Sequence, residues 1–492
     1  MAPRVVTFSL LLALAAPLPA AISTGALERH IDVLASDAFE GRAPGTAGEK
    51  KTTDYIVSQW QAIGLEPAGD NGGWLQEVTL VNRTPLNQTV SWRHKLRHLG
   101  QDQSAILLLG DGPRETISGA PVWFAGHGTN IDDAKLDGAI VLVLSEPREG
   151  VADLDSRIAA LAAKGAAAVI SIAPAEIPWR RIQQSYERGR DVLDSKLVPP
   201  VRGVLSAEGA AELMRFAGGD PDMLRKAGKD IGFAPRRLKT SGTIDANTQV
   251  RRTITHNVVG RLRGSGSTGE SLLYLGHWDH LGICRAEGEP DRICNGAVDN
   301  ASGIAALIEI ARGLAAAPRR PRDTLFLATT AEEIGLLGAR AFAARPPVPL
   351  ASIVAAINLD TVAIAPKGEK VAVMGRGVPA LDALVDATVQ QAGRTLDTDD
   401  EADALVQRQD GWALAQFGVP TLMVGGSFSD MKLLETFLNG AYHEASDNPG
   451  PGLPLEGAAE DADLLVALGL KLADPTLYRH VPAAGTATRS PL

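Results

Sequence analysis

Histidine, aspartate and glutamate residues follow several apolar segments in the second half of this 492-residue chain. Each one alone has an ordinary explanation, because an Asp before a helix is a common N-cap and a lone His is more often structural than a ligand. Gathered in one buried place, the carboxylates would carry more negative charge than a protein interior tolerates without cations. Imidazole and carboxylate together suit zinc, and a carboxylate shared by two ions suits a two-metal centre. The candidates are His277, Asp279, Asp299, Glu332, Glu333, Asp360, Tyr442, His443 and Asp447.

The segments that precede these residues alternate between strand and helix patterns. Short apolar runs are separated by amphipathic stretches such as residues 302–317. This alternation predicts an α/β fold, a three-layer α/β/α domain with a mixed, mostly parallel twisted sheet that is covered on both faces. Ligands in such sheets bind beyond the carboxyl ends of the strands, so we expect the candidate residues at one edge. The predicted strands are residues 271–276, 323–330, 351–359, 370–375 and 420–426.

The N-terminus has the layout of a secretory signal peptide. Arg4 precedes an apolar stretch that ends in small residues near Ala20 and Ala21, and this stretch is too short to span a bilayer comfortably. We therefore expect an exported protein, periplasmic or extracellular, without membrane contact after signal removal. The predicted organisation is a signal peptide at 1–21, the first part of the main domain at 22–85, a β-rich inserted module at 86–249, the catalytic part at 250–475 and a disordered tail at 476–492.

Charge and cysteine content narrow the possible partners and the compartment. The net charge is −10 and no Lys- or Arg-rich run occurs, which argues against a nucleic-acid partner. The two cysteines, Cys284 and Cys294, are close in the sequence, and in an oxidising compartment they predict a disulfide. The alternative is a pair of thiolate metal ligands, which we favour less because a better ligand set lies nearby.

Five motifs in order resemble those of the secreted di-zinc aminopeptidase family. They are GHWDHLG, NGAVDNASG, TTAEEIGLLGA, INLD and YHEASDN, and the early EGRAPGTAG fits the same pattern. The family includes bacterial leucine aminopeptidase, aminopeptidase Y and glutamate carboxypeptidase. The resemblance covers residues 25–80 and 256–472, and the inserted module resembles a protease-associated domain through KLDGAIVLVLSEP and AAKGAAAVISIAP.

The resemblance implies a division of the metal ligands between two zinc ions. His277 and Asp360 would bind one ion. Glu333 and His443 would bind the other, and Asp299 would bridge both.

Other residues would act around these ligands. Glu332 would be the general base, because successive side chains diverge and its neighbour would hold a metal. Asp279 would hydrogen-bond the first metal-bound imidazole and orient it, and Tyr442 would help to stabilise the oxyanion. Asn300 follows the bridging residue, where the family often has a cis peptide bond. We expect His280 in a loop or beside the ligands rather than among them.

The implied activity is that of an exported metallo-aminopeptidase with two Zn²⁺ per chain. Its partners would be peptides with a free N-terminus, and the protein would be a monomer or a small homo-oligomer. A carboxypeptidase on the same scaffold, a catalytically inactive binding protein and a single-zinc enzyme similar to glutaminyl cyclase are the alternatives. In the segment VQRQDGWALAQFGVP, Asp410 keeps an acidic position of the family pattern but its neighbours differ, which leaves the side-chain preference open.

Overall fold

The computed structural model describes residues 21–227 and 230–480, and the chain divides into two compact units. The larger unit is Met1–Val78 together with Ile254–Leu492, and the smaller unit is Thr79–Thr253. Residues 1–20 of the predicted signal peptide and residues 481–492 of the predicted tail lie outside the described residues. Within the described part of the chain, no helix has both the length and the apolar character that a membrane span requires.

Two long strands carry the chain from one unit into the other. They are β2 (Leu75–His94) and β10 (Arg236–Leu262), and the division between the units falls inside both. The predicted limits of the inserted module, residues 86 and 249, lie within the smaller unit. Both strands run through the division without interruption, so the division does not coincide with the end of an element.

The larger unit contains a mixed sheet whose central strands run parallel. Strands β17, β15, β11 and β14 are parallel neighbours, and the antiparallel strands β16 and β10 flank them. In spatial order the sheet consists of β16 (Ala372–Met374), β17 (Thr421–Gly425), β15 (Ile353–Asn358), β11 (Ser271–His277), β14 (Asp323–Thr329) and the end of β10, with β1 (Glu66–Pro67) beside β10.

The central strand β11 is buried along its whole length because its side chains alternate between two cores. Leu272 and Tyr274 belong to one hydrophobic cluster, and Leu273 and Leu275 belong to another. Successive side chains of a strand point to opposite faces, so a strand that is apolar at nearly every position needs cover on both sides. The Tyr274 hydroxyl also donates a hydrogen bond of 2.7 Å to the backbone oxygen of Leu465.

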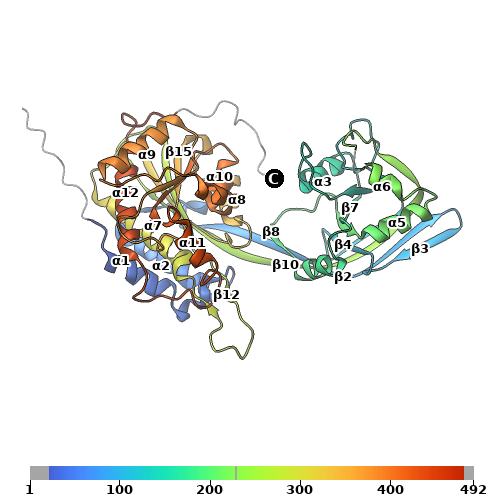
Figure 1. Ribbon diagram of the computed structural model, residues 1–492, viewed down its shortest axis with the longest axis horizontal. Helices are drawn as coiled ribbons and strands as arrows, with labels where there is room; N and C mark the ends of the chain where they lie inside the picture. Colours follow the sequence, from blue (N-terminus) through green and yellow to red (C-terminus); the bar gives the residue numbers. More distant parts are fainter. Residues whose placement is uncertain (1–20, 228–229, 481–492) are drawn as a thin grey trace, which may run out of the picture. The chain divides into compact units, whose positions relative to one another are not determined.

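Helices cover both faces of this sheet (Figure 1). The arrangement is the predicted three-layer α/β/α architecture, and the fold class is thereby confirmed. One face packs against α1 (Thr24–Leu34), α2 (Ala47–Ile63), α7 (Gly303–Ala316), α9 (Pro379–Gln391) and α12 (Leu455–Leu472), and the other face packs against α8 (Leu337–Ala344) and α10 (Asp410–Ala415).

The strands of the smaller unit continue the sheet from the first part of β10, and this unit has its own hydrophobic core. Strands β5, β6, β7 and β9 are parallel neighbours, β4 pairs antiparallel with β9, and the first part of β10 pairs with β5. Its elements besides β2 and β10 are β3 (Arg97–Gln101), β4 (Ile106–Gly110), β5 (Arg114–Phe124), β6 (Ile140–Leu144), α3 (Leu154–Ala163), β7 (Ala168–Ile172), α4 (Trp179–Arg188), β8 (Asp191–Leu193), β9 (Val201–Leu205), α5 (Ala207–Phe216) and α6 (Asp222–Ala227).

Candidate metal centre

Parallel pairing brings three strand ends to one edge of the larger unit's sheet. His277 is the last residue of β11 and is in register with Thr329, the last residue of β14. Asn358, the last residue of β15, pairs with Leu275. The loop after β14 carries the two candidate glutamates, and the loop after β15 carries Asp360. The sheet register therefore gathers these polar side chains at its carboxyl edge.

Asp299 lies between two histidines and presents one oxygen to each. Its Oδ1 is 3.3 Å from Nε2 of His277, and its Oδ2 is 3.3 Å from Nε2 of His443. His277 Nε2 is also 3.5 Å from Oδ1 of Asp360, and His443 Nε2 is 2.8 Å from Oε2 of Glu333. A carboxylate that faces two separate His–carboxylate pairs has the arrangement needed to bridge two metal ions.

The backbone around Asp299 is held by a second carboxylate. Asp299 lies in a π-helical turn, Ala297–Ser302, which precedes α7, and the Asp299–Asn300 peptide bond is cis. The Asp447 carboxylate accepts hydrogen bonds from the backbone N–H of Val298 at 2.9 Å and of Asp299 at 3.1 Å. Asp447 therefore positions the central carboxylate through its backbone.

Asn300 connects the Asp299 turn to the loop that carries Asp360. Its side-chain nitrogen donates to the backbone oxygen of Leu359 at 3.0 Å. Its side-chain oxygen accepts the backbone N–H groups of Gly303 at 2.9 Å and of Thr361 at 3.2 Å. This amide is hydrogen-bonded through both its nitrogen and its oxygen, and it keeps the two loops in one arrangement, which a preorganised metal site requires.

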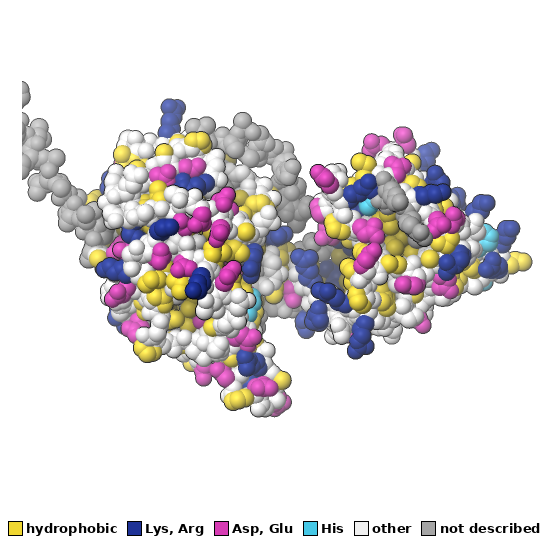
Figure 2. Space-filling model, in the orientation of Figure 1, with side chains coloured by type: hydrophobic (Ala, Val, Ile, Leu, Met, Phe, Trp, Pro, Cys, Tyr) yellow, Lys and Arg dark blue, Asp and Glu magenta, His cyan; other side chains and the backbone are white. Residues whose placement is uncertain are grey.

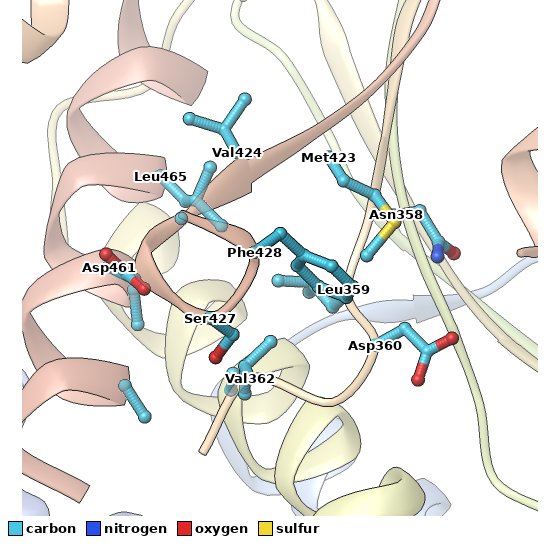
Figure 3. A pocket seen from close by; sticks show the side chains of 14 residues that line it. Asn358, Leu359, Asp360, Val362, Met423, Val424, Ser427, Phe428, Asp461 and Leu465 are labelled. Atoms are coloured by element: carbon cyan, nitrogen blue, oxygen red, sulfur yellow. The ribbon is translucent and has the colours of Figure 1, made fainter. Parts of the chain in front are cut away.

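A buried carboxylate elsewhere in the larger unit is neutralised differently. Asp461 is 3.2 Å from a guanidinium nitrogen of Arg394 and accepts the backbone N–H of Gly426 at 2.7 Å. Asp461 and Asp360 line the same small cavity from opposite sides (Figure 3). Within the described residues Asp360 has no arginine or lysine partner, and it forms an ion pair with His277.

The metal centre holds more negative charge than the chain neutralises. Burial raises the pKa of Glu332 well above its usual range, and nearby Asp410 and Asp360 raise it further. Burial by itself lowers the pKa of His277, but Glu332 and Asp360 outweigh this effect and raise it well above its usual range. Both shifts report carboxylates crowded together with little water. Divalent cations would remove this excess charge.

The types of donor atom at the site, like its excess negative charge, are suited to metal ions. Nε2 of His443 is buried and makes no hydrogen bond among the described residues, although two carboxylate oxygens lie close to it. Donor atoms of His277, Glu332 and Asp360 lie within 4.8 Å of one another, and so do those of His277, Asp299 and Glu333. Imidazole nitrogen and carboxylate oxygen are the usual protein ligands of zinc.

Residues 257–453 match the model of Peptidase family M28. The match confirms, for this segment, a resemblance to a peptidase family, as the motifs predict, and we call residues 257–453 the M28 segment. It contains every predicted metal ligand.

Several solved structures are similar to the chain at low sequence identity. An aminopeptidase from Aneurinibacillus sp. strain AM-1 is 17% identical, with 92% of this chain and 95% of that chain covered and a TM-score of 0.48. A zinc aminopeptidase from Bacillus subtilis is 19% identical, with 91% and 94% covered and a TM-score of 0.44. A Peptidase M28 precursor from Shewanella amazonensis SB2B is 16% identical, with 94% and 98% covered and a TM-score of 0.43. No curated protein matched the chain.

His280 contacts a predicted ligand of the M28 segment. Its ring is buried, and Nδ1 lies 2.6 Å from Oε1 of Glu333, the oxygen that does not face His443. The sequence leaves this histidine in a loop or beside the ligands. The structure places it on Glu333, where it can orient the carboxylate toward the centre.

His277 does not donate the expected hydrogen bond to the Asp279 carboxylate. Nδ1 of His277 is 3.1 Å from the backbone oxygen of Asp279 and 3.9 Å from its carboxylate. The carboxylate instead accepts the backbone N–H of Glu332 at 3.1 Å, which fixes the start of the glutamate loop. A backbone carbonyl orients a histidine as well as a carboxylate does, and the sequence does not distinguish the two.

A cleft of about 370 Å³ opens at the metal centre. Glu332 lines it on the side of His277 and Asp360, and Tyr442 lines it with its ring stacked on His443 at a centroid distance of 3.7 Å. The Tyr442 hydroxyl accepts a hydrogen bond of 3.2 Å from Arg408. The cleft is therefore bordered by both predicted catalytic residues.

Two arginines in the cleft wall receive no role from the sequence. They are Arg340 and Arg408, both exposed, and neither forms an ion pair with a described carboxylate. Surface arginines are common, so the sequence alone does not indicate which of them lie in a cleft. Their position in the cleft bears on which end of a peptide the site accepts.

Arg42 is a further functional residue that the motif EGRAPGTAG contains but does not explain. Its side chain is 1% exposed and donates hydrogen bonds to the backbone oxygens of Leu34, Trp278, Asn295 and Gly296. Burial lowers its pKa to about 10, and nearby carboxylates counteract this shift. The Arg42 guanidinium thus connects the segment after His277 with the segment before Asp299.

The predicted disulfide is present in the structure. Cys284 and Cys294 are bonded to each other across a short two-stranded hairpin. An ion pair between Arg285 and Glu444 links this hairpin to the turn that carries His443. The hairpin is therefore attached to the segment of one predicted ligand.

Proposed function

We propose that the protein is an exported aminopeptidase that hydrolyses the N-terminal residue of peptides at a two-zinc centre. The match of residues 257–453 to Peptidase family M28 supports a metal-dependent peptidase. The observation that carries the finer proposal is the position of Asp299, which presents one oxygen to His277 and the other to His443.

The ligands divide into two groups around Asp299. His277 and Asp360 would hold one zinc ion, and Glu333 and His443 would hold the other. When bound, the two ions would lower the pKa of a water molecule and polarise the scissile carbonyl.

The remaining roles belong to the side chains of the cleft. Glu332 takes the proton of the attacking water and passes it to the leaving amine, which needs a carboxylate that is close to the centre but free of a metal. The protonated phenol of Tyr442 donates a hydrogen bond to the developing oxyanion. Burial raises the pKa of Tyr442, so the phenol keeps its proton at neutral pH.

An apolar pocket beside the cleft supports cleavage next to an apolar residue. It shares Asp360, Arg408 and Tyr442 with the cleft, so a side chain in the pocket lies next to the metal ligands. Burial of an apolar side chain there would contribute to binding. The apolar lining is Met374, Leu405, Met423, Phe428, Leu434 and Leu438.

Metal analysis and a substrate panel test the proposal together. We expect two zinc ions per chain, and faster hydrolysis of leucyl- than of glutamyl- or lysyl-p-nitroanilide. Chelation should abolish the reaction, and added zinc should restore it. One metal per chain, or hydrolysis that resists chelation, would contradict the two-zinc proposal.

A carboxypeptidase is the second candidate, and the cleft arginines favour it. Arg340 and Arg408 could bind the free carboxylate of a peptide, since guanidinium groups pair well with carboxylates. Release of leucine from an N-acetylated peptide, compared with hydrolysis of leucyl-p-nitroanilide, separates the two activities. An aminopeptidase cleaves only the substrate with the free amine.

Export and the inserted module complete the proposal. The Cys284–Cys294 disulfide supports an oxidising compartment, as the signal-peptide pattern does. We propose that the smaller unit is a protease-associated domain. Mass measurement of the mature protein from the producing cell tests the export step, because signal removal would shorten the chain at Ala20 or Ala21.

A further inference from the structure

A cavity of about 360 Å³ lies within the smaller unit, outside the M28 segment. It opens among β2, α3, α4, β8 and β9, and this volume is in the range of small-molecule sites. One part of its wall is apolar and the other part is cationic. The apolar part is formed by Val81, Leu109, Leu154, Ile158, Val192 and Leu197.

Three arginines form the cationic part of the wall, and they are incompletely neutralised. Arg83 is buried and pairs with Asp111 at 2.9 Å. Arg202 lies 3.3 Å from Asp155, whose side chain is 77% exposed, so water screens this pair. Arg190 makes no ion pair or hydrogen bond with any described residue. The cavity therefore carries a net positive charge.

The left-handed backbone of Gly189 and its close packing against Asn82 and Thr84 fix the loop that carries Arg190. Gly189 has φ +70°, and a Cβ atom there would lie 2.4 Å from Oδ1 of Asn82. The next residues pair with β2, with Val192 opposite Val81. Only glycine allows this approach, so the cationic wall is held against the apolar wall by the sheet itself.

Tyr186 adds a hydrogen-bond donor without a partner. Its ring packs against the apolar side chains of Leu107, Ala173 and Val204, and it lines the cavity. Its hydroxyl makes no hydrogen bond with the described residues. Burial raises its pKa to about 12, so the phenol stays protonated and can donate to an anion. Figure 2 shows basic side chains gathered on the smaller unit around the position of β8.

We propose that this cavity binds the C-terminal carboxylate of a peptide that ends in an apolar residue. Arginine side chains match the planar, two-oxygen shape of a carboxylate, and the apolar wall would take the last side chain. An inorganic anion would use the arginines alone and leave the apolar wall unfilled. The proposal does not depend on the reaction at the metal centre.

Titration calorimetry of the whole protein with N-acetyl-Gly-Leu and with its C-terminal amide tests this proposal. Chromatography of the mixture verifies that the ligand stays intact. We expect saturable binding of the acid and at least tenfold weaker binding of the amide. Arg190→Gln and Arg202→Gln should each weaken binding of the acid at least tenfold. Arg190 is exposed, so its substitution should leave the fold unchanged.

Arg188→Gln is the matched control, because Arg188 ends α4 but does not line the cavity. It should bind the acid as the unchanged protein does, and all three variants should hydrolyse leucyl-p-nitroanilide at the unchanged rate. Three results would overturn the proposal. They are equal binding of the acid and the amide, no binding of either, and unaltered binding of the acid by both cavity variants. Displacement of the acid by inorganic phosphate at equal affinity would also overturn it and would indicate a general anion site.

Discussion

Asp461 and Asp299 are both buried carboxylates of the larger unit, 5% and 3% exposed, but their charges are balanced in different ways. Asp461 pairs with Arg394, so the chain supplies the compensating cation. Among the described residues Asp299 forms ion pairs only with histidines, and more carboxylates surround those histidines. Buried Arg42 lies near the cluster, but its guanidinium donates to backbone oxygens and pairs with none of the described carboxylates. The difference indicates that a buried acidic cluster without a paired arginine or lysine favours binding of cations from outside the chain.

The proposed role of Asp299 as the shared metal ligand gives the largest expected effect. Asp299→Ala should remove the shared ligand, so metal content should fall below that of the unchanged protein and peptidase activity should be lost. Asp461→Asn should retain both metal and activity, because that carboxylate is balanced within the chain. Elemental analysis and leucyl-p-nitroanilide hydrolysis measure both variants. Normal metal content in the Asp299 variant would contradict the proposed difference between Asp299 and Asp461.

Glu332→Gln separates catalysis from metal binding, because it removes a negative charge near the candidate metal centre without removing a proposed ligand. We expect retained metal and a turnover lower by about 10²–10⁴-fold, the usual contribution of a general base. The matched control is Glu435→Gln on the exposed side of α11 (Met431–Leu438), which should match the unchanged enzyme. Turnover near the unchanged value would refute the assignment of Glu332, and loss of metal would make it a ligand.

Arg394→Met tests the balanced carboxylate. Removing one partner of a buried pair leaves a charge without compensation, and we expect the free energy of unfolding to fall by about 3 kcal/mol at pH 8. Burial raises the pKa of Asp461 to about 6 even with the arginine present. Asp461 is therefore protonated at pH 5, and the loss should be smaller there. Denaturant unfolding at the two pH values measures this, and an equal loss at both would contradict the mechanism.

The smallest effect is expected at an ion pair between α2 and β10. His256 Nδ1 lies 2.9 Å from Oε1 of Glu49, and this hydrogen bond raises the pKa of His256 in the folded protein. The pair therefore stabilises the fold fully below the unfolded pKa of about 6.5, and this contribution is lost as the pH rises through the folded value.

His256→Gln should accordingly lower the free energy of unfolding by about 1 kcal/mol or less at pH 5.5, and by less at pH 9. Both proteins are measured without metal, so that metal release at low pH does not enter the difference. A larger loss at pH 9 than at pH 5.5 would have the wrong sign for a protonated histidine.

The strands were the most predictable part of the fold. β11 and β15 are apolar at nearly every position, so only a strand buried on both faces satisfies them, and the parallel order follows from the helices between them. The transfer of β2 and β10 between the units was not predictable. Both strands run through the division without interruption, although residues 249–254 of β10 are exposed or half-buried, and the choice of neighbour is made by packing.

At the metal centre, motifs predicted the residues but not all of their contacts. Two contacts became visible only in the structure. They are the contact of His280 with Glu333 and that of His277 with the backbone oxygen of Asp279. The sequence does not predict them, because several polar groups lie within hydrogen-bonding distance of one imidazole ring. Arg42 was missed because its four hydrogen bonds go to backbone groups, which have no signature in the sequence.

The sequence by itself determined which residue types end each strand, since burial and the period of two are properties of a few consecutive residues. From this alone a charged cluster at one sheet edge could be foreseen. The tertiary structure alone decided that Asp299 faces both His277 and His443, and that Arg190 and Arg202 share a cavity. Those pairings join segments far apart in the chain, and packing of the whole unit sets such distances.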